Sequence, residues 1–314
     1  MCTRLVRNDT IDVIARRVPR QGVKFSDEQF FTNQQVPSHD WSTATATPLR
    51  YGFIETACGQ RVAIMRRSTR LSFALAACML VPVAISTGCT VLERAGNDWR
   101  TARRDSSGQA PDPATTPEAV IQVYGARTVG WRGAFGVHTW IVTKPSGAGH
   151  YTRHEVVGWG VDQGMSTVRV NRAGPDNYWF GAFPEKLADV RGPHVDALIE
   201  RVSLAVRNYP YPSTYRTWPG PNSNTFVAYI ARALPELGVD MPPTAIGKDF
   251  LPGGAVLARS PSGTGVQVSV LGVAGVLVGW EEGVEINLLG LTLGLDLKSP
   301  GIKLPGLGRL GFPQ

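Results

Sequence analysis

Two short segments of this sequence contain residue types that could carry out acyl transfer. The first is Asn222-Ser223-Asn224-Thr225, which follows the turn-forming run Trp218-Pro219-Gly220-Pro221 and precedes apolar residues at helical spacing. Ser223 is therefore expected at a helix N-terminus, where backbone N–H groups and the helix dipole stabilise a negative charge. The same residue types are also good helix caps, and sequence physics alone favours a capping role.

The second segment is Val137-His138-Thr139-Trp140, which has the composition of a strand. His138 could act as a general base, or it could be a core histidine satisfied by one hydrogen bond. The next strand offers His154 and Glu155, and either could orient His138, depending on the register of the hairpin. A turn at residues 146–147 would place His138 across from residues 154–156.

The elements that must position these residues are strands and two helices. β-branched content predicts strands at 119–124, 135–143, 150–158 and 167–170, and apolar spacing predicts helices at 193–207 and 223–237. This order predicts an α+β domain over residues 119–314, with an antiparallel sheet and two main helices.

The end of the chain is rich in Val, Leu and Gly. It predicts a C-terminal β-hairpin extension, or three strands, from about residue 265, and an irregular tail from residue 299. These apolar strands could form a lipid-contacting surface or serve a structural role in the cell envelope. Packing of the strands inside the protein is the simpler explanation.

A strand His followed by Asn-Ser-x-x-Phe-Val at a helix start resembles the circularly permuted branch of the NlpC-type papain-like superfamily. That branch includes the lecithin:retinol acyltransferase-like proteins. The likeness spans about residues 120–240 and implies a permuted papain-like core. In such a core Ser223 would be the nucleophile, His138 the base and His154 or Glu155 the orienting group. Backbone N–H groups at 223–224 would form the oxyanion hole, and the cleft would be bordered by Asn222, Asn224, Trp218 and Trp140.

This chain departs from that family at the nucleophile, because Ser223 occupies the position of the family's Cys. The four cysteines are Cys2, Cys58, Cys78 and Cys89, so none follows residue 89. Ser is the weaker nucleophile and needs a well-placed base. Two functions stay open: a Ser–His hydrolase or acyltransferase acting on envelope amides or esters, and a non-catalytic protein that binds a peptide or acyl chain.

A second resemblance rests on residues 215–226 together with 247–254. These segments resemble an uncharacterised bacterial envelope family, a domain of unknown function, over about residues 119–312. This resemblance implies no known activity. The Gly-rich run at 245–254 lacks the phosphate-loop pattern and is predicted to be a loop flanking the site.

Residues 65–88 have the features of a signal peptide. Arg66, Arg67 and Arg70 precede eighteen uncharged residues that end before Cys89. The sequence Ser86-Thr87-Gly88-Cys89 resembles the lipobox of bacterial lipoproteins, although Ser86 stands where an aliphatic residue is usual. This resemblance implies lipidation of Cys89 and a location on the periplasmic side of a bacterial membrane. One transmembrane helix is the alternative, although eighteen residues barely span a bilayer core of about 30 Å.

The remaining segments and the charge complete the predicted organisation. Residues 1–64 lack sustained periodicity, which we interpret as a start-site error with Met65 as the true start, or as a disordered extension. Residues 89–118 are predicted to be a flexible, lipidated tether. The net charge is +7, but residues 89–314 hold 21 basic and 19 acidic residues, so nucleic-acid binding is not expected. No cofactor or metal site is expected, and the sequence leaves the oligomeric state open.

Overall fold

The computed structural model describes residues 52–94 and 98–312 of the chain. Helix α1 (Gly52–Arg94) continues through Pro82 and includes the predicted signal segment. Within it, Thr69–Leu92 is long and apolar enough to cross a membrane, and a signal sequence has the same properties. Either interpretation is compatible with export. Of the predicted extension, residues 1–51 lie outside the described residues, and the rest belongs to α1.

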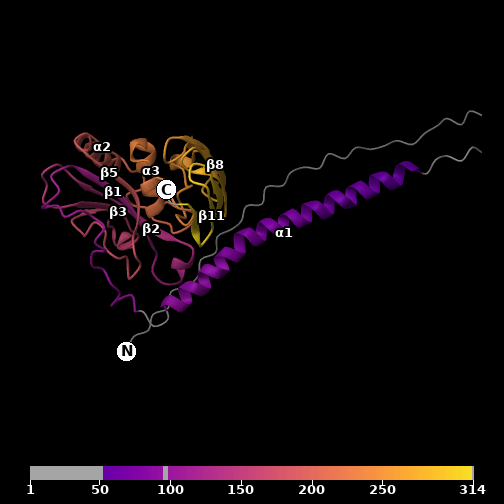
Figure 1. Cartoon of the computed structure of the whole chain (residues 1–314), viewed down its shortest axis with the longest axis horizontal. Helices are drawn as coiled ribbons and strands as arrows, with labels where there is room; N and C mark the ends of the chain where they lie inside the picture. Colours follow the sequence, from indigo (N-terminus) through magenta and orange to yellow (C-terminus); the bar gives the residue numbers. More distant parts are fainter. Residues whose placement is uncertain (1–51, 95–97, 313–314) are drawn as a thin grey trace, which may run out of the picture. The chain divides into compact units, whose positions relative to one another are not determined.

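The first of two antiparallel sheets follows, and it has the strand order β4-β3-β2-β1-β5 (Figure 1). Its strands are β1 (Val120–Arg127), β2 (Val137–Lys144), β3 (Thr152–Val156), β4 (Val168–Asn171) and β5 (Glu185–Arg191). The four strands predicted from the sequence are confirmed. The sequence did not predict β5, because its charged residues suit an edge strand and hide the apolar pattern.

The two predicted helices are α2 (Val195–Arg207) and α3 (Ser223–Ala233), and they cover one face of this sheet. Their apolar sides pack against inward-facing strand residues such as Ile121, Val123 and Ile141. The other face carries a second cluster that includes Tyr124 and Trp140. Since successive strand residues point to opposite faces, neighbours along β2 enter different environments.

The second sheet has seven antiparallel strands in the order β12-β11-β10-β9-β8-β7-β6. They are β6 (Leu257–Arg259), β7 (Gly265–Val270), β8 (Ala274–Gly279), β9 (Gly283–Leu288), β10 (Leu291–Asp296), β11 (Gly301–Leu304) and β12 (Gly308–Gly311). A C-terminal β extension is confirmed, but it is larger than predicted. It begins at Leu257, and the segment predicted to be an irregular tail forms β11 and β12, because Pro300 and Pro305 lie in the turns before and between these strands, while Gly301, Gly308 and Gly311 lie at strand ends.

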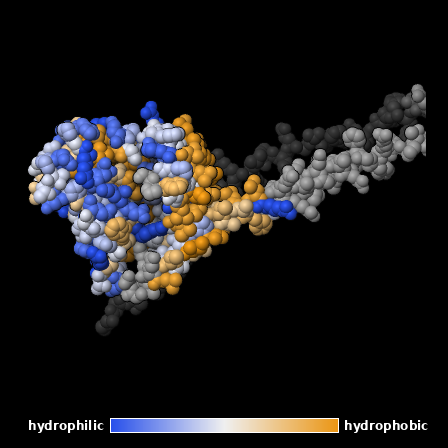
Figure 2. Space-filling model, viewed as in Figure 1, coloured by the Kyte–Doolittle hydropathy of each residue, from blue (hydrophilic) through white to orange (hydrophobic). Residues whose placement is uncertain are grey.

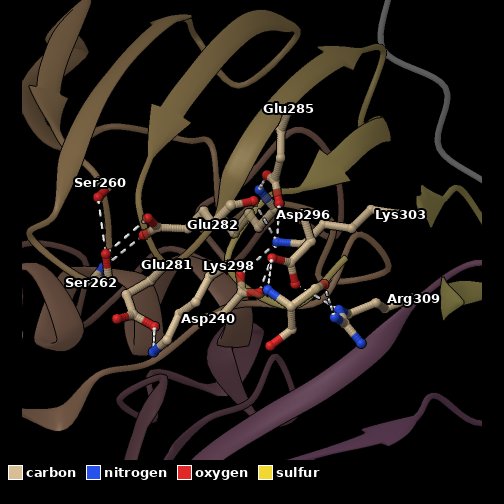
Figure 3. A network of polar contacts seen from close by, with 12 residues as sticks. Asp240, Ser260, Ser262, Glu281, Glu282, Glu285, Asp296, Lys298, Lys303 and Arg309 are labelled. Atoms are coloured by element: carbon tan, nitrogen blue, oxygen red, sulfur yellow. Dashed lines mark hydrogen bonds and ion pairs between the residues drawn. The ribbon is translucent and has the colours of Figure 1, made fainter. Parts of the chain in front are cut away.

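The second sheet is attached to the rest of the domain through buried charges (Figure 3). The ammonium of Lys303 lies 2.8 Å from both carboxylate oxygens of Asp240 and 2.8 Å from Glu285, and Lys248 pairs with the other oxygen of Glu285. Gly294 lies between Glu285 and Lys303 in the strand register. A Cβ there would come within 3.0 Å of Glu285, so glycine leaves the space in which the two charges meet.

Part of the predicted tether is fixed on the domain. The Asp176 carboxylate accepts hydrogen bonds from the Ser106 hydroxyl at 2.8 Å and from the backbone N–H groups of Gln109 and Ala110 at 2.6 and 3.0 Å. The prediction of a flexible tether over 89–118 is therefore wrong for residues 106–110. A Ser/Gly composition is typical of linkers, but here a carboxylate distant in the sequence orders the segment.

Candidate functional site

A cavity of about 620 Å³ lies where β2 begins and β3 ends. Its walls are mainly aromatic and aliphatic and include Phe135, Trp159, Trp179, Tyr215, Trp218 and Leu289. Five of the residues predicted for the site line it: His138, Trp218, Asn222, Ser223 and Asn224. The cavity therefore brings together residues that are far apart in the chain, from Val83 of α1 to Leu291 of β10.

Asn222 caps helix α3, and Ser223 occupies the first helical position. The Asn222 side-chain oxygen accepts hydrogen bonds from the N–H groups of Asn224 and Thr225 at 2.9 and 3.1 Å. The Thr225 hydroxyl oxygen accepts one from the Asn222 N–H at 3.1 Å, which completes a capping box. Capping is thus performed by Asn222 and Thr225. The Ser223 hydroxyl makes no hydrogen bond to any residue that the structure describes.

Asn224 joins the start of α3 to strand β2 on both sides of His138. Its amide nitrogen donates to the carbonyl oxygens of Val137 and Ile246 at 3.0 and 2.8 Å, and its oxygen accepts from the Thr139 hydroxyl at 2.9 Å. The side chain is buried, so these bonds form where water does not compete. Asn224 therefore positions the helix start against the strand.

His138 pairs with Glu155 from the neighbouring strand. Its Nε2 lies 2.9 Å from a Glu155 oxygen, and the Arg153 guanidinium lies 2.9 Å from the same oxygen. Burial would raise the pKa of Glu155, but its partners His138 and Arg153 outweigh burial and lower that pKa to about 2. Burial lowers the pKa of His138 despite Glu155, so the ring is neutral at pH 7. Because Glu155 is ionised, Nε2 carries the proton and the Nδ1 lone pair is free to accept one.

The register of the hairpin separates the two candidate partners of His138. Ile141 pairs with His154, so His138 is level with Val157 and shares a sheet face with Glu155. His154 points to the helix-covered face and contacts the Thr143 hydroxyl at 3.1 Å. Burial lowers its pKa to about 4. Glu155 is therefore the partner of His138, and His154 lies away from it.

Alternation along β2 also keeps His138 from meeting Ser223 directly. Thr139 faces α3, and its hydroxyl lies 3.3 Å from the Ser223 carbonyl oxygen. His138 faces the other side, where its ring stacks on Trp179 with centroids 3.9 Å apart. No hydrogen bond joins Ser223 to His138 within the described chain. Both residues nevertheless line the cavity.

The two tryptophans predicted to border the site occupy different environments. Trp218 is about half exposed and donates its indole N–H to the Leu289 carbonyl at 2.9 Å. Trp140 is fully buried beneath Arg153, whose guanidinium carbon lies 4.1 Å from the ring centroid. Trp140 does not line the cavity, because its side chain packs in the second core cluster, with Tyr124, on the sheet face opposite the helices.

Large aromatic residues such as Trp159 and Trp179 are expected from the sequence in the core or in cleft walls, and both line the cavity. Tyr215 and Leu289 could not be predicted as wall residues. They come from the loop between α2 and α3 and from the connection between β9 and β10, so no local pattern groups them. The described part of the chain contains no group of three His, Cys, Asp or Glu side chains that could bind a metal ion.

Comparison with known proteins finds a match to a protein family. Residues 118–250 match the family described as a protein of unknown function (DUF3750). The resemblance to an uncharacterised domain family is therefore confirmed over this range, which is shorter than the range predicted. No curated protein and no solved structure matches the chain significantly.

Proposed function

We propose that this protein is an exported, membrane-anchored envelope protein whose cavity binds an acyl chain through its ester or amide group. The observation that carries this proposal is the apolar cavity with one polar edge at the start of α3. Its volume of about 620 Å³ lies in the range of about 300–1,000 Å³ typical of small-molecule sites.

The two sides of the cavity suit the two parts of such a ligand. An aliphatic chain would pack against Trp159, Tyr215 and Trp218, where burial of apolar surface favours binding. A carbonyl oxygen would accept from the Ser223 hydroxyl, which makes no other hydrogen bond within the described residues. The positive end of the α3 dipole favours the same oxygen. A peptide with an apolar side chain is the competing ligand.

Photoaffinity labelling of the full chain in membranes tests this function. A fatty acid carrying a diazirine should label cavity residues, and an excess of unlabelled fatty acid should prevent labelling. I246W adds bulk to the cavity wall and should abolish labelling. L204W makes a similar change at an exposed position on α2 and should not affect it. Equal labelling of both variants would refute an acyl-binding cavity.

A second candidate function is acyl transfer or hydrolysis by a permuted papain-like core. It is favoured by the His138–Glu155 pair, which leaves Nδ1 of His138 available as a base at the cavity that Ser223 also lines. The Ser223 oxygen would attack the substrate carbonyl carbon, and its proton would pass to Nδ1 of His138 through one bridging water, because the two side chains do not meet directly. The histidine would then return that proton to the leaving alcohol or amine. Water or an acceptor alcohol would finally release the acyl group from Ser223.

Labelling with a fluorophosphonate distinguishes the two functions. A catalytic serine should react, and labelling should be lost in S223A and fall at least about 100-fold in H138Q, as expected for loss of a general base. T139S keeps the hydroxyl that faces Ser223 and should label normally. Acyl photolabelling without fluorophosphonate labelling would leave binding as the function.

The proposed anchor at Cys89 has its own test. A lipidated Cys89 should give signal processing that globomycin inhibits and that C89A abolishes. C78A changes a cysteine within the apolar segment and should be processed normally. Unprocessed, membrane-integral protein in every case would instead identify Thr69–Leu92 as a transmembrane helix.

A further inference from the structure

The second sheet exposes its apolar side chains on a broad face, which we call the apolar face. Cross-strand pairing aligns them in three rows. The rows are Leu257-Val268-Val276-Ile286-Leu293, Val266-Val278-Val284-Leu295-Ile302-Leu310 and Val270-Ala274-Leu288-Leu291. Most of these side chains are between 44% and 67% exposed. Figure 2 shows apolar residues gathered where Figure 1 draws this sheet.

The other face of the same sheet is polar and covered. Gln267, Ser269, Glu285 and Asn287 alternate with the apolar rows, and all four are buried. An antiparallel sheet with one covered face normally buries apolar residues and exposes polar ones. Here the arrangement is reversed, so the apolar rows do not serve the protein core. An apolar surface of this extent marks an interaction site.

A lipid bilayer is within reach of this face because the chain itself carries a membrane-directed helix. Thr69–Leu92 has the length and composition to cross a membrane. From the end of α1 at Arg94, only eleven residues precede Ser106, which is fixed on Asp176. An extended segment of that length spans at most about 40 Å. A retained helix would therefore hold the domain beside the bilayer.

The rim and the backbone of the apolar face also suit a bilayer surface. Trp280 and Phe312 are 63% and 71% exposed at a turn and at the end of β12. Aromatic side chains are favoured at the level of the lipid headgroups. Exposed Arg259 ends the row that contains Val266, where it could meet anionic headgroups. The backbone groups between strands are paired, so the face can lie flat on the interface while its edges stay hydrated.

We propose that the apolar face docks on the surface of the lipid bilayer to which this chain is tethered. The turn residue Leu289, at the end of the third row, and Leu291 within that row also line the cavity, so the docked surface continues to the cavity wall. This proposal does not depend on what the cavity binds. A second copy of the chain, packed face to face, is the competing occupant.

Site-specific photocrosslinking tests the proposal in the full chain. The protein would be reconstituted in vesicles of phosphatidylethanolamine and phosphatidylglycerol, with benzoylphenylalanine in place of Val268 or Leu295. Both positions should form phospholipid adducts at least about tenfold more than the exposed α2 position Glu200, because only the apolar face would contact acyl chains. Crosslinked dimers in place of lipid adducts would overturn the proposal, and so would adducts at the Glu200 level.

A charge variant checks that apolar contact is the cause. V276D/I286D places two carboxylates in the same row as Val268, at positions that are 46% and 44% exposed, so folding should be preserved. Lipid adducts at position 268 should fall at least about tenfold, because Asp is strongly disfavoured in contact with lipid. V170D changes a 54% exposed residue of β4 and should leave the adducts unchanged. Unchanged adducts in V276D/I286D, with an unchanged urea midpoint, would also overturn the proposal.

Discussion

Replacing Lys303 by Met should destabilise the domain strongly, because the ammonium joins the second sheet to the rest of the protein. Its side chain is 1% exposed, and its three N–H groups reach Asp240, Glu285 and the Glu282 carbonyl at 2.8–2.9 Å. Met fills a similar volume but leaves buried carboxylates without that charge. Removing one member of a buried ion pair typically costs about 3–5 kcal/mol. We expect K303M to lose about this much free energy of unfolding.

Urea unfolding of the full chain in mild detergent, followed by tryptophan fluorescence, measures the change. K298M is the matched control, because the Lys298–Glu281 pair at 2.6 Å is partly exposed, with side chains that are 49% and 26% accessible. Such pairs contribute roughly 0–1 kcal/mol. A K303M loss no larger than that of K298M would refute the reasoning.

The pH dependence gives a second check on the same network. The charges of Lys248 and Lys303 outweigh burial and lower the pKa of Glu285, whereas Glu285 and Asp240 raise the pKa of Lys303. Stability from Glu285 is therefore present above its ordinary pKa of 4.5 and is lost as pH falls through the lowered value. The difference between wild type and K303M should be constant from pH 6 to 9 and should shrink in acid.

Three further predictions concern the site and the loops around it. N224A removes three hydrogen bonds of 2.8–3.0 Å from a buried side chain and should cost about 3 kcal/mol in urea unfolding, because the Val137 carbonyl, the Thr139 hydroxyl and the Ile246 carbonyl each lose one bond, although Ile246 keeps the one from Asn222; a loss below about 1 kcal/mol would contradict the positioning role of Asn224. Because burial lowers the pKa of His154 to about 4, stability should fall as pH drops from 6.5 to 4, and H154Q should flatten the fall of Tm over that range. Gly247 has φ +96 and a Cβ there would lie 2.3 Å from the Asn222 amide, so G247A should cost about 3 kcal/mol by urea unfolding, whereas G149A, at an open position, should be nearly neutral.

The segments around Ser223 and His138 show which features of the candidate site can be predicted from the sequence. The helix start at Ser223 and the strand around His138 could be predicted, because capping residues and β-branched content act locally. Which of His154 and Glu155 partners His138 could not be predicted. A shift of one residue in the hairpin register reverses the face of every side chain, and only the folded sheet fixes that register.

In the second sheet, too, the sequence predicts the strands but not which face of the sheet is buried. Alternating Val and Leu after residue 257 determine that strands form there. Alternation of apolar and polar residues along a strand, however, indicates only that the two faces of the sheet differ. It does not indicate which face packs against the domain. Lys248, Asp240 and Glu285 decide that question in the tertiary structure, because their buried charges hold the polar face against the domain. The sequence by itself determined an apolar helix, an α+β domain and a polar helix start. The folded chain alone decided that these elements enclose an apolar cavity and leave an apolar face exposed, because both depend on contacts between residues far apart in sequence.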